Sequence, residues 1–170
     1  MKKRLKYSVF LLVGLIVLNA CSLANTMDNE LFKYRGSYIG DNSAVLNIIK
    51  QLPQNKAFKK LTLATKEEPY GMEVEYGDLN VSDKEKDQVI KETVIMNATY
   101  LFALIKNAEW VTFDFNGQKY RVTRTKLENW YGTKLKVYTN EEDLKKAIQD
   151  NLDNKNKVNQ FYEKKNPTKK

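Results

Sequence analysis

The chain has 170 residues, of which 42% are apolar, and a formal net charge of +8. This length supports one domain with a hydrophobic core and is too short for two. The chain has one cysteine and no histidine, which excludes Ser-His-Asp and Cys-His catalysis, histidine-ligated metals, paired-cysteine zinc or redox sites and an intramolecular disulfide.

The positive charge lies at the two ends of the chain. Residues 1–20 carry +4 and residues 155–170 carry +5, whereas residues 21–154 have a net charge of −1. Domains that bind nucleic acid usually carry a basic face on their folded part. The near-neutral central part therefore argues against nucleic acid as a partner.

The first 21 residues, MKKRLKYSVFLLVGLIVLNAC, have the pattern of a targeting segment. Basic residues precede an apolar run from Val9 to Leu18, which as a helix spans about 15 Å, half of a bilayer core of roughly 30 Å. This length is typical of a signal peptide and short for a transmembrane helix. Leu18-Asn19-Ala20-Cys21 then resembles a bacterial lipobox, so we expect a lipoprotein signal peptide over residues 1–20.

Cys21 would then carry a diacylglycerol thioether and a palmitate-type anchor. Two acyl chains matter because one chain gives marginal, reversible membrane binding. The expected location is the extracytoplasmic face of the cell membrane, an oxidising compartment that suits a chain with no other thiol. The alternative is an uncleaved N-terminal anchor with an incidental cysteine.

Residues 21–32 are expected to be a tether, 33–152 a single domain and 153–170 a basic disordered tail.

The first half of the domain shows one helix and two strands. Asp41 or Asn42 caps a predicted helix that ends near Leu52. Alternation of apolar and polar residues predicts strands over 61–65 and 72–76, the second with an acidic outer face.

The second half repeats a helix followed by a hairpin. Ser82 and Glu85 have the spacing of a capping box, which predicts a long helix to about Ile105. Asn116-Gly117 is the preferred pair for a type I′ turn between strands 109–115 and 118–124. This turn fixes the register, and the expected pairs are Phe113 with Tyr120, Val111 with Val122, Asp114 with Lys119, Thr112 with Arg121 and Glu109 with Arg124.

Three shorter elements are predicted after the hairpin. A capping box at Thr125 and Glu128 precedes a short helix, residues 134–138 read as a short strand, and Thr139 with Glu142 caps a last helix to Leu152. The element order predicts an α+β fold with two layers, in which helices pack on one face of a mostly antiparallel sheet of about four strands.

Two stretches resemble a known family. They are KYRGSYIGDNSAVLNIIKQLP (33–53) and TKEEPYGMEVEYG (65–77), and their specific parts are YIGDNS and EPYG. They are similar to the bacterial family called domain of unknown function 4825, over residues 31 to 124 or so. The resemblance implies a secreted or lipid-anchored module. Because the family has no assigned activity, it implies no catalytic or ligand residues.

The candidate ligand or partner surface lies at the start of the first predicted helix. Helix N-termini bind anions through exposed amides and the helix dipole. The alternative is a turn and a helix cap, helped by the glycines at 36 and 40. The candidate residues are Tyr34, Tyr38, Asp41, Asn42 and Ser43.

Other candidate sites are weaker. The acidic segment 67–87 has no Ca²⁺-binding loop pattern and fits a solvated strand face. Paired carboxylates could cleave glycans, but Asp114, the most apolar-flanked acid, is expected to face Lys119. Aromatic residues could line a sugar- or peptide-binding surface or complete the core, and the basic tail could contact anionic lipid. The aromatic candidates are Trp110, Trp130 and Tyr131, with Phe161 and Tyr162 in the tail.

Two function classes remain open at this point. The favoured one is a binding or accessory module, with sensing as one such role, that meets an envelope protein or polymer. The alternative is a small envelope enzyme that uses carboxylates, such as a glycan hydrolase. We expect no catalytic residue, no metal and no cofactor. The sequence leaves the oligomeric state open.

Overall fold

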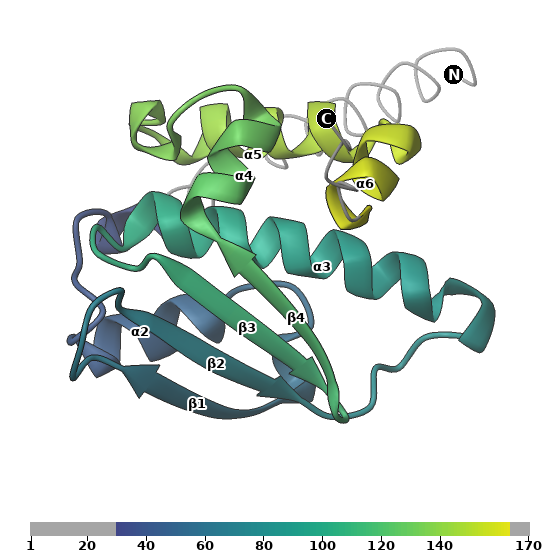
Figure 1. Ribbon diagram of the computed structural model, residues 1–170, viewed down its shortest axis with the longest axis horizontal. Helices are drawn as coiled ribbons and strands as arrows, with labels where there is room; N and C mark the ends of the chain where they lie inside the picture. The colour runs from purple at the N-terminus through teal and green to yellow at the C-terminus, as the bar shows by residue number, and fades with distance from the viewer. Residues whose placement is uncertain (1–29, 164–170) are drawn as a thin grey trace, which may run out of the picture.

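The computed structural model describes residues 30–163, which form one sheet with helices packed on it (Figure 1). The predicted signal peptide, Cys21 and nearly all of the tether lie outside these residues, as do residues 164–170. The elements are η1 (Phe32–Tyr34), α2 (Asn42–Ile49), η2 (Asn55–Ala57), β1 (Phe58–Ala64), β2 (Gly71–Tyr76), α3 (Asp83–Leu104), β3 (Trp110–Phe115), β4 (Gln118–Thr123), α4 (Arg124–Tyr131), η3 (Leu135–Val137), α5 (Glu141–Leu152) and α6 (Lys155–Tyr162).

The sheet has four strands in the order β1-β2-β3-β4. The outer pairs are antiparallel, and the central pair, β2 and β3, is parallel. Parallel neighbours need a long crossover, which α3 provides. The predicted α+β class and the mostly antiparallel four-stranded sheet are confirmed. The register of β1 shifts at a bulge between Phe58 and Lys60.

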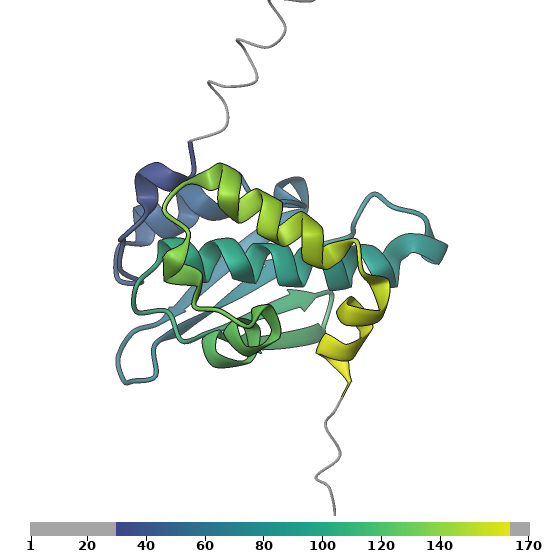
Figure 2. The same cartoon turned by 90° about the horizontal axis from the view of Figure 1, so that it is seen from above.

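The core lies between the inner face of the sheet and α3. Met72 and Val74 of β2 and Phe113 of β3 are fully buried there. On the side away from the sheet, α5 crosses α3, so the second half of α3 is buried on several sides (Figure 2). The Tyr76 hydroxyl accepts a hydrogen bond from Asn97 Nδ2 at 3.1 Å, and burial raises the pKa of Tyr76 to about 12.

The hairpin β3–β4 has the predicted register. Phe113 pairs with Tyr120, and Asp114 pairs with Lys119. The turn residues Asn116 and Gly117 have φ values of 52° and 91°, the left-handed values that a type I′ turn requires. The two turn residues therefore determine the register of β3 and β4.

Two predicted helix starts are also confirmed. The Asp41 carboxylate accepts the Ala44 N–H at 3.0 Å and caps α2. Helix α3 begins after Ser82, as predicted, but the capping-box hydrogen bonds are replaced by one from the Ser82 hydroxyl to the Glu85 carboxylate at 2.5 Å.

The caps predicted for the last two helices of the domain are wrong by one or two residues. Helix α4 begins directly at the end of β4, so Thr123 rather than Thr125 caps it, accepting the Lys126 N–H at 3.2 Å. Asn140 rather than Thr139 caps α5, accepting the Asp143 N–H at 2.8 Å.

Two further predictions near the C-terminus are corrected. Residues 134–138 form no strand, because η3 turns the chain there and buries Leu135. The tail expected to be disordered from residue 153 contains α6, whose Val158 and Phe161 are buried in the core. The folded region thus extends past residue 152.

Candidate functional site

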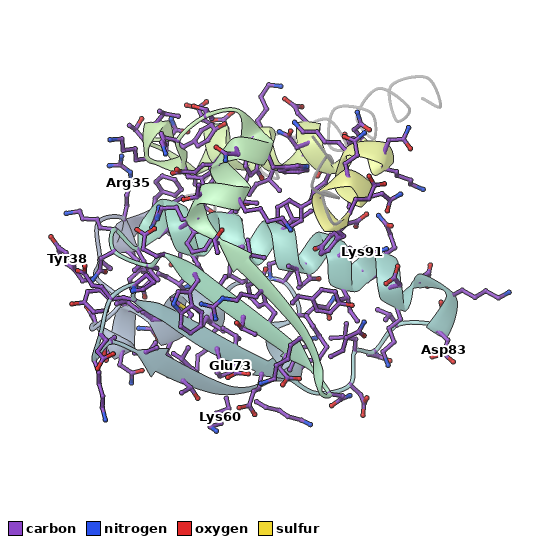
Figure 3. All side chains as sticks on the ribbon, viewed as in Figure 1. Arg35, Tyr38, Lys60, Glu73, Asp83 and Lys91 are labelled. Carbon is purple, nitrogen blue, oxygen red and sulfur yellow. The ribbon has the colours of Figure 1, made fainter. Side chains whose placement is uncertain are left out.

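The carboxyl end of α3 is where the first family-like stretch packs. The Gly36 N–H donates to the Leu104 carbonyl at 2.8 Å, and the Lys106 N–H donates to the Ser37 carbonyl at 2.9 Å. The Ile39 N–H donates to Asn107 Oδ1 at 2.8 Å. Figure 3 shows Arg35 and Tyr38 at this end of the molecule. These contacts fix residues 36–39 against the end of the helix.

The second family-like stretch reaches the same loop. The Glu109 N–H donates to the Tyr70 carbonyl at 2.8 Å. The Trp110 indole covers Gly71, where an added Cβ would lie 2.1 Å from the ring, and its Nε1 donates to the Pro69 carbonyl at 2.8 Å. The loop 106–109 therefore contacts both stretches. Position 71 requires glycine because the Trp110 ring leaves no room for a Cβ there.

Arg124 closes the end of α3. Its guanidinium donates to the carbonyls of Phe102 and Ile105 at 2.7 Å and of Ala108 at 2.9 Å. Burial lowers the pKa of Arg124, while the nearby Glu109 and Glu128 act in the opposite direction. The charge of Arg124 thus satisfies carbonyls that a helix end leaves without donors.

A hollow of about 490 Å³ lies beside Arg124, between residues 35–36, the end of α3, α4 and η3. Its acids are engaged by cations: Lys134 Nζ lies 2.8 Å from Glu128, and Arg124 Nε lies 3.6 Å from Glu109. The lining residues are Arg35, Gly36, Phe102, Ala103, Lys106, Glu109, Arg124, Glu128, Lys134 and Lys136. The wall of the hollow therefore has an excess of positive charge.

Three cations of this wall have no carboxylate partner within the part of the chain that the structure describes. They are Arg35, Lys106 and Lys136. Arg35 is held in place by backbone instead, because its Nε donates to the Tyr138 carbonyl at 3.2 Å and its Nη2 to the Lys136 carbonyl at 3.1 Å. Lys106 Nζ lies 5.3 Å from the centre of the Tyr38 ring.

The five predicted surface residues differ in their surroundings. Tyr38 is 57% exposed. Its ring lies against Lys106, which lines the basic hollow. Tyr34 is half-buried against the core, and its carbonyl accepts the Ser37 hydroxyl at 2.7 Å. The Asp41 carboxylate occupies the N-terminus of α2, where a bound anion would have to compete with it. Asn42 and Ser43 are exposed in the same first turn.

The cations around Tyr38 were not predicted from the sequence. Arg35, Lys106 and Lys136 come from three distant segments, and the sequence gives no sign that they converge. The available signal was Arg35, which lies inside the first family-like stretch.

The remaining acidic candidates have structural partners. Glu75 lies 3.4 Å from Lys60 on the outer face of the sheet, and Glu73 pairs with Lys119 there. The prediction for Asp114 is confirmed, since it faces Lys119 at 3.6 Å. Within residues 30–163, no group of three or more potential ligands (His, Cys, Asp or Glu) is placed to hold a metal ion.

The aromatic candidates also pack against the protein. Trp130 is half-buried, and its Nε1 donates to the Lys157 carbonyl at 3.0 Å. The Tyr131 hydroxyl lies 3.0 Å from Thr99 Oγ1, and burial raises the pKa of Tyr131. In the tail, Phe161 is buried and the Tyr162 hydroxyl donates to the Lys91 carbonyl at 2.6 Å.

Comparison with known proteins identifies one family. The family model "Domain of unknown function (DUF4825)" matches residues 31–127, more than half of the chain, which agrees with the predicted resemblance. No curated protein and no solved structure matches the chain. Among the described residues, no helix has the length and apolar character needed to cross a bilayer. The chain belongs to the DUF4825 family.

Proposed function

We propose that the chain is a lipid-anchored protein of the extracytoplasmic face of the cell membrane and that its domain is a binding or accessory module. The anchor rests on the signal-peptide pattern and on Cys21 within the lipobox-like segment. The binding role rests on one observation: both family-like stretches meet at the 106–109 loop, beside a hollow with unpaired positive charge.

The buried carboxylates support a binding role over an enzymatic one. Glu128 accepts the Leu135 N–H at 3.2 Å and the Lys134 ammonium. Glu141 accepts the Leu31 N–H at 3.2 Å. The oxygens of these two carboxylates are thus used to hold chain segments onto the domain, whereas a catalytic pair must be free to reach a substrate.

The first test is lipidation. Cells that express the chain are grown with a radiolabelled fatty acid and then fractionated. The intact chain should be labelled and recovered with membranes, whereas Cys21→Ala should lose the label and accumulate as the precursor. Ser22→Ala is the matched control and should behave as the intact chain. Equal labelling of Cys21→Ala would contradict the proposed anchor.

The second test is the binding surface. A photo-crosslinking residue is placed at Tyr38 or, as a control, at the exposed Thr62 of β1, and intact cells are irradiated. A defined envelope component, whether lipid, polymer or protein, attached at position 38 and not at position 62 is the expected result. Equal attachment at both positions would contradict a binding role for the end of α3.

A further inference from the structure

We propose that the domain docks on the anionic membrane surface that carries its anchor, through an end face formed by Arg35, Tyr38, Lys106, Lys136 and Val137. This inference rests on the proposed lipid anchor and names the occupant of the surface next to it. Charge, exposed apolar side chains and the position of the tether each support it.

The charge of the end face is complementary to that of an anionic membrane. Arg35, Lys106 and Lys136 line one hollow and have no carboxylate partner in the described part of the chain. The carbonyl end of a helix normally repels anions, but here Arg124 donates to the carbonyls of Phe102 in the last turn of α3 and of Ile105 at its C-cap. Each Lys or Arg near an anionic bilayer strengthens binding about fivefold, so three unpaired cations contribute on the order of 100-fold.

The guanidinium of Arg35 is also oriented for this role. Two of its N–H groups are used by the carbonyls of Lys136 and Tyr138. A guanidinium has five N–H donors, so the others remain for a lipid phosphate. Holding the group in place reduces the side-chain entropy that phosphate binding would otherwise cost.

Two exposed apolar side chains on the end face also favour contact with a membrane. Tyr38 and Val137 are 57% and 54% exposed, and they are the large hydrophobic side chains that stand out as exposed among residues 30–163. The Tyr38 ring lies against Lys106, and Val137 directly follows Lys136. Tyrosine is enriched at the headgroup level of membranes because its ring is apolar and its hydroxyl polar.

The tether joins the domain close in sequence to the end face. Eight residues, 22–29, separate Cys21 from Glu30, and the nine steps between the two Cα atoms span at most about 30 Å. Arg35 follows five residues after Glu30. The end face is therefore among the parts of the domain that a lipid at Cys21 keeps close to the bilayer.

Acidic side chains border the end face and define its limit. Asp143, in the first turn of α5, acts electrostatically on Tyr138. Glu141 is turned inward and buried. Glu142 and Asp143 are exposed acids of the first turn of α5, and their repulsion from an anionic bilayer favours orientations in which that turn lies away from it.

The test uses the full lipidated chain in vesicles, with lipidation checked by mass. A fluorophore is attached at Gly40→Cys, where an added Cβ meets nothing within 4 Å, or at Lys84→Cys near the far end of α3. Figure 3 places Tyr38 and Asp83 at opposite ends of the molecule. Quenching by spin-labelled headgroups is compared between phosphatidylcholine vesicles and vesicles with one third phosphatidylglycerol.

We expect strong quenching at position 40 on the anionic vesicles, weak quenching at position 84, and loss of the difference at high salt. Replacing Arg35, Lys106 and Lys136 by Gln should lower the ratio of docked to undocked protein about 100-fold. The matched control replaces Lys50, Lys60 and Lys155 by Gln, which removes equal charge elsewhere, and should retain quenching.

Three results would overturn the docking proposal. They are equal quenching at positions 40 and 84, no dependence on lipid charge, and saturable binding of glycerol phosphate at the end face without docking, which would assign the cations to a soluble anion. If the lipidated chain does not dock, the docking proposal is wrong and the proposed lipid anchor is unaffected. If cells do not lipidate the chain, the proposed lipid anchor itself is wrong. The two failures are therefore distinguishable.

Discussion

Two charged surfaces of this domain differ in how their charges are balanced. On the outer face of the sheet, Lys60 pairs with Glu75 and Lys119 pairs with Glu73, and Figure 3 shows Lys60 and Glu73 on that face. At the end of α3, Arg35 and Lys106 have no such partners among the described residues. A binding surface is therefore indicated less by how many charged side chains it has than by whether other side chains of the domain pair with them.

The largest effect is expected at Arg124, because it donates to carbonyls at the end of α3, beside the hollow that the unpaired cations line. Arg124→Met removes a donor from three carbonyls. We expect the free energy of unfolding to fall by about 3 kcal/mol, measured by urea denaturation. The matched change on the sheet is Arg121→Met, which removes a guanidinium 3.9 Å from the Trp110 ring and should cost about 0.5–1 kcal/mol. If both variants lost the same free energy of unfolding, the larger structural role assigned to Arg124 would be wrong.

A smaller loss is expected at Gly71, where the sheet meets the 106–109 loop. Gly71→Ala places a Cβ 2.1 Å from the Trp110 ring, so the indole must move and its hydrogen bond to the Pro69 carbonyl is lost. We expect a cost of about 2 kcal/mol in urea denaturation, with a shift in tryptophan fluorescence. Gly40→Ala is the control, since its Cβ meets nothing within 4 Å. A Gly71→Ala variant as stable as the control would show that the indole is not held there.

The smallest effect is expected on the outer face of the sheet. Lys60→Gln breaks an ion pair whose lysine side chain is 64% exposed. The free energy of unfolding should change by no more than about 0.5 kcal/mol in urea denaturation, because solvent screens exposed pairs. A loss above 1 kcal/mol in the free energy of unfolding would mean that the ion pairs on the sheet stabilise the fold and do not only balance its charge.

The parts that could be predicted from sequence are those decided by neighbouring residues. Asn116-Gly117 determines both the turn and the register of β3 and β4. Asp41 caps α2 through an amide three residues away. In each case the controlling interaction lies within a few residues of its partner, so the local pattern contains the necessary information.

The parts that could not be predicted depend on distant contacts. The parallel pairing of β2 with β3 joins strands separated by α3. Helix α6 is polar in sequence and is ordered because Val158 and Phe161 reach the core. The candidate surface follows the same rule: Tyr38 was identified, whereas Lys106 and Lys136 become its neighbours through tertiary folding.

The bulge in β1 has a consequence for contacts between molecules. β1 lies at one edge of the sheet, where a regular strand could be extended by a strand of another chain. The register shift between Phe58 and Lys60 interrupts the regular row of backbone donors and acceptors, and the strand carries Lys59 and Lys60 at that point. Bulges and lysines at an edge both disfavour intermolecular sheet extension. The same short segment that completes the sheet thus also protects the folded chain from edge-to-edge aggregation.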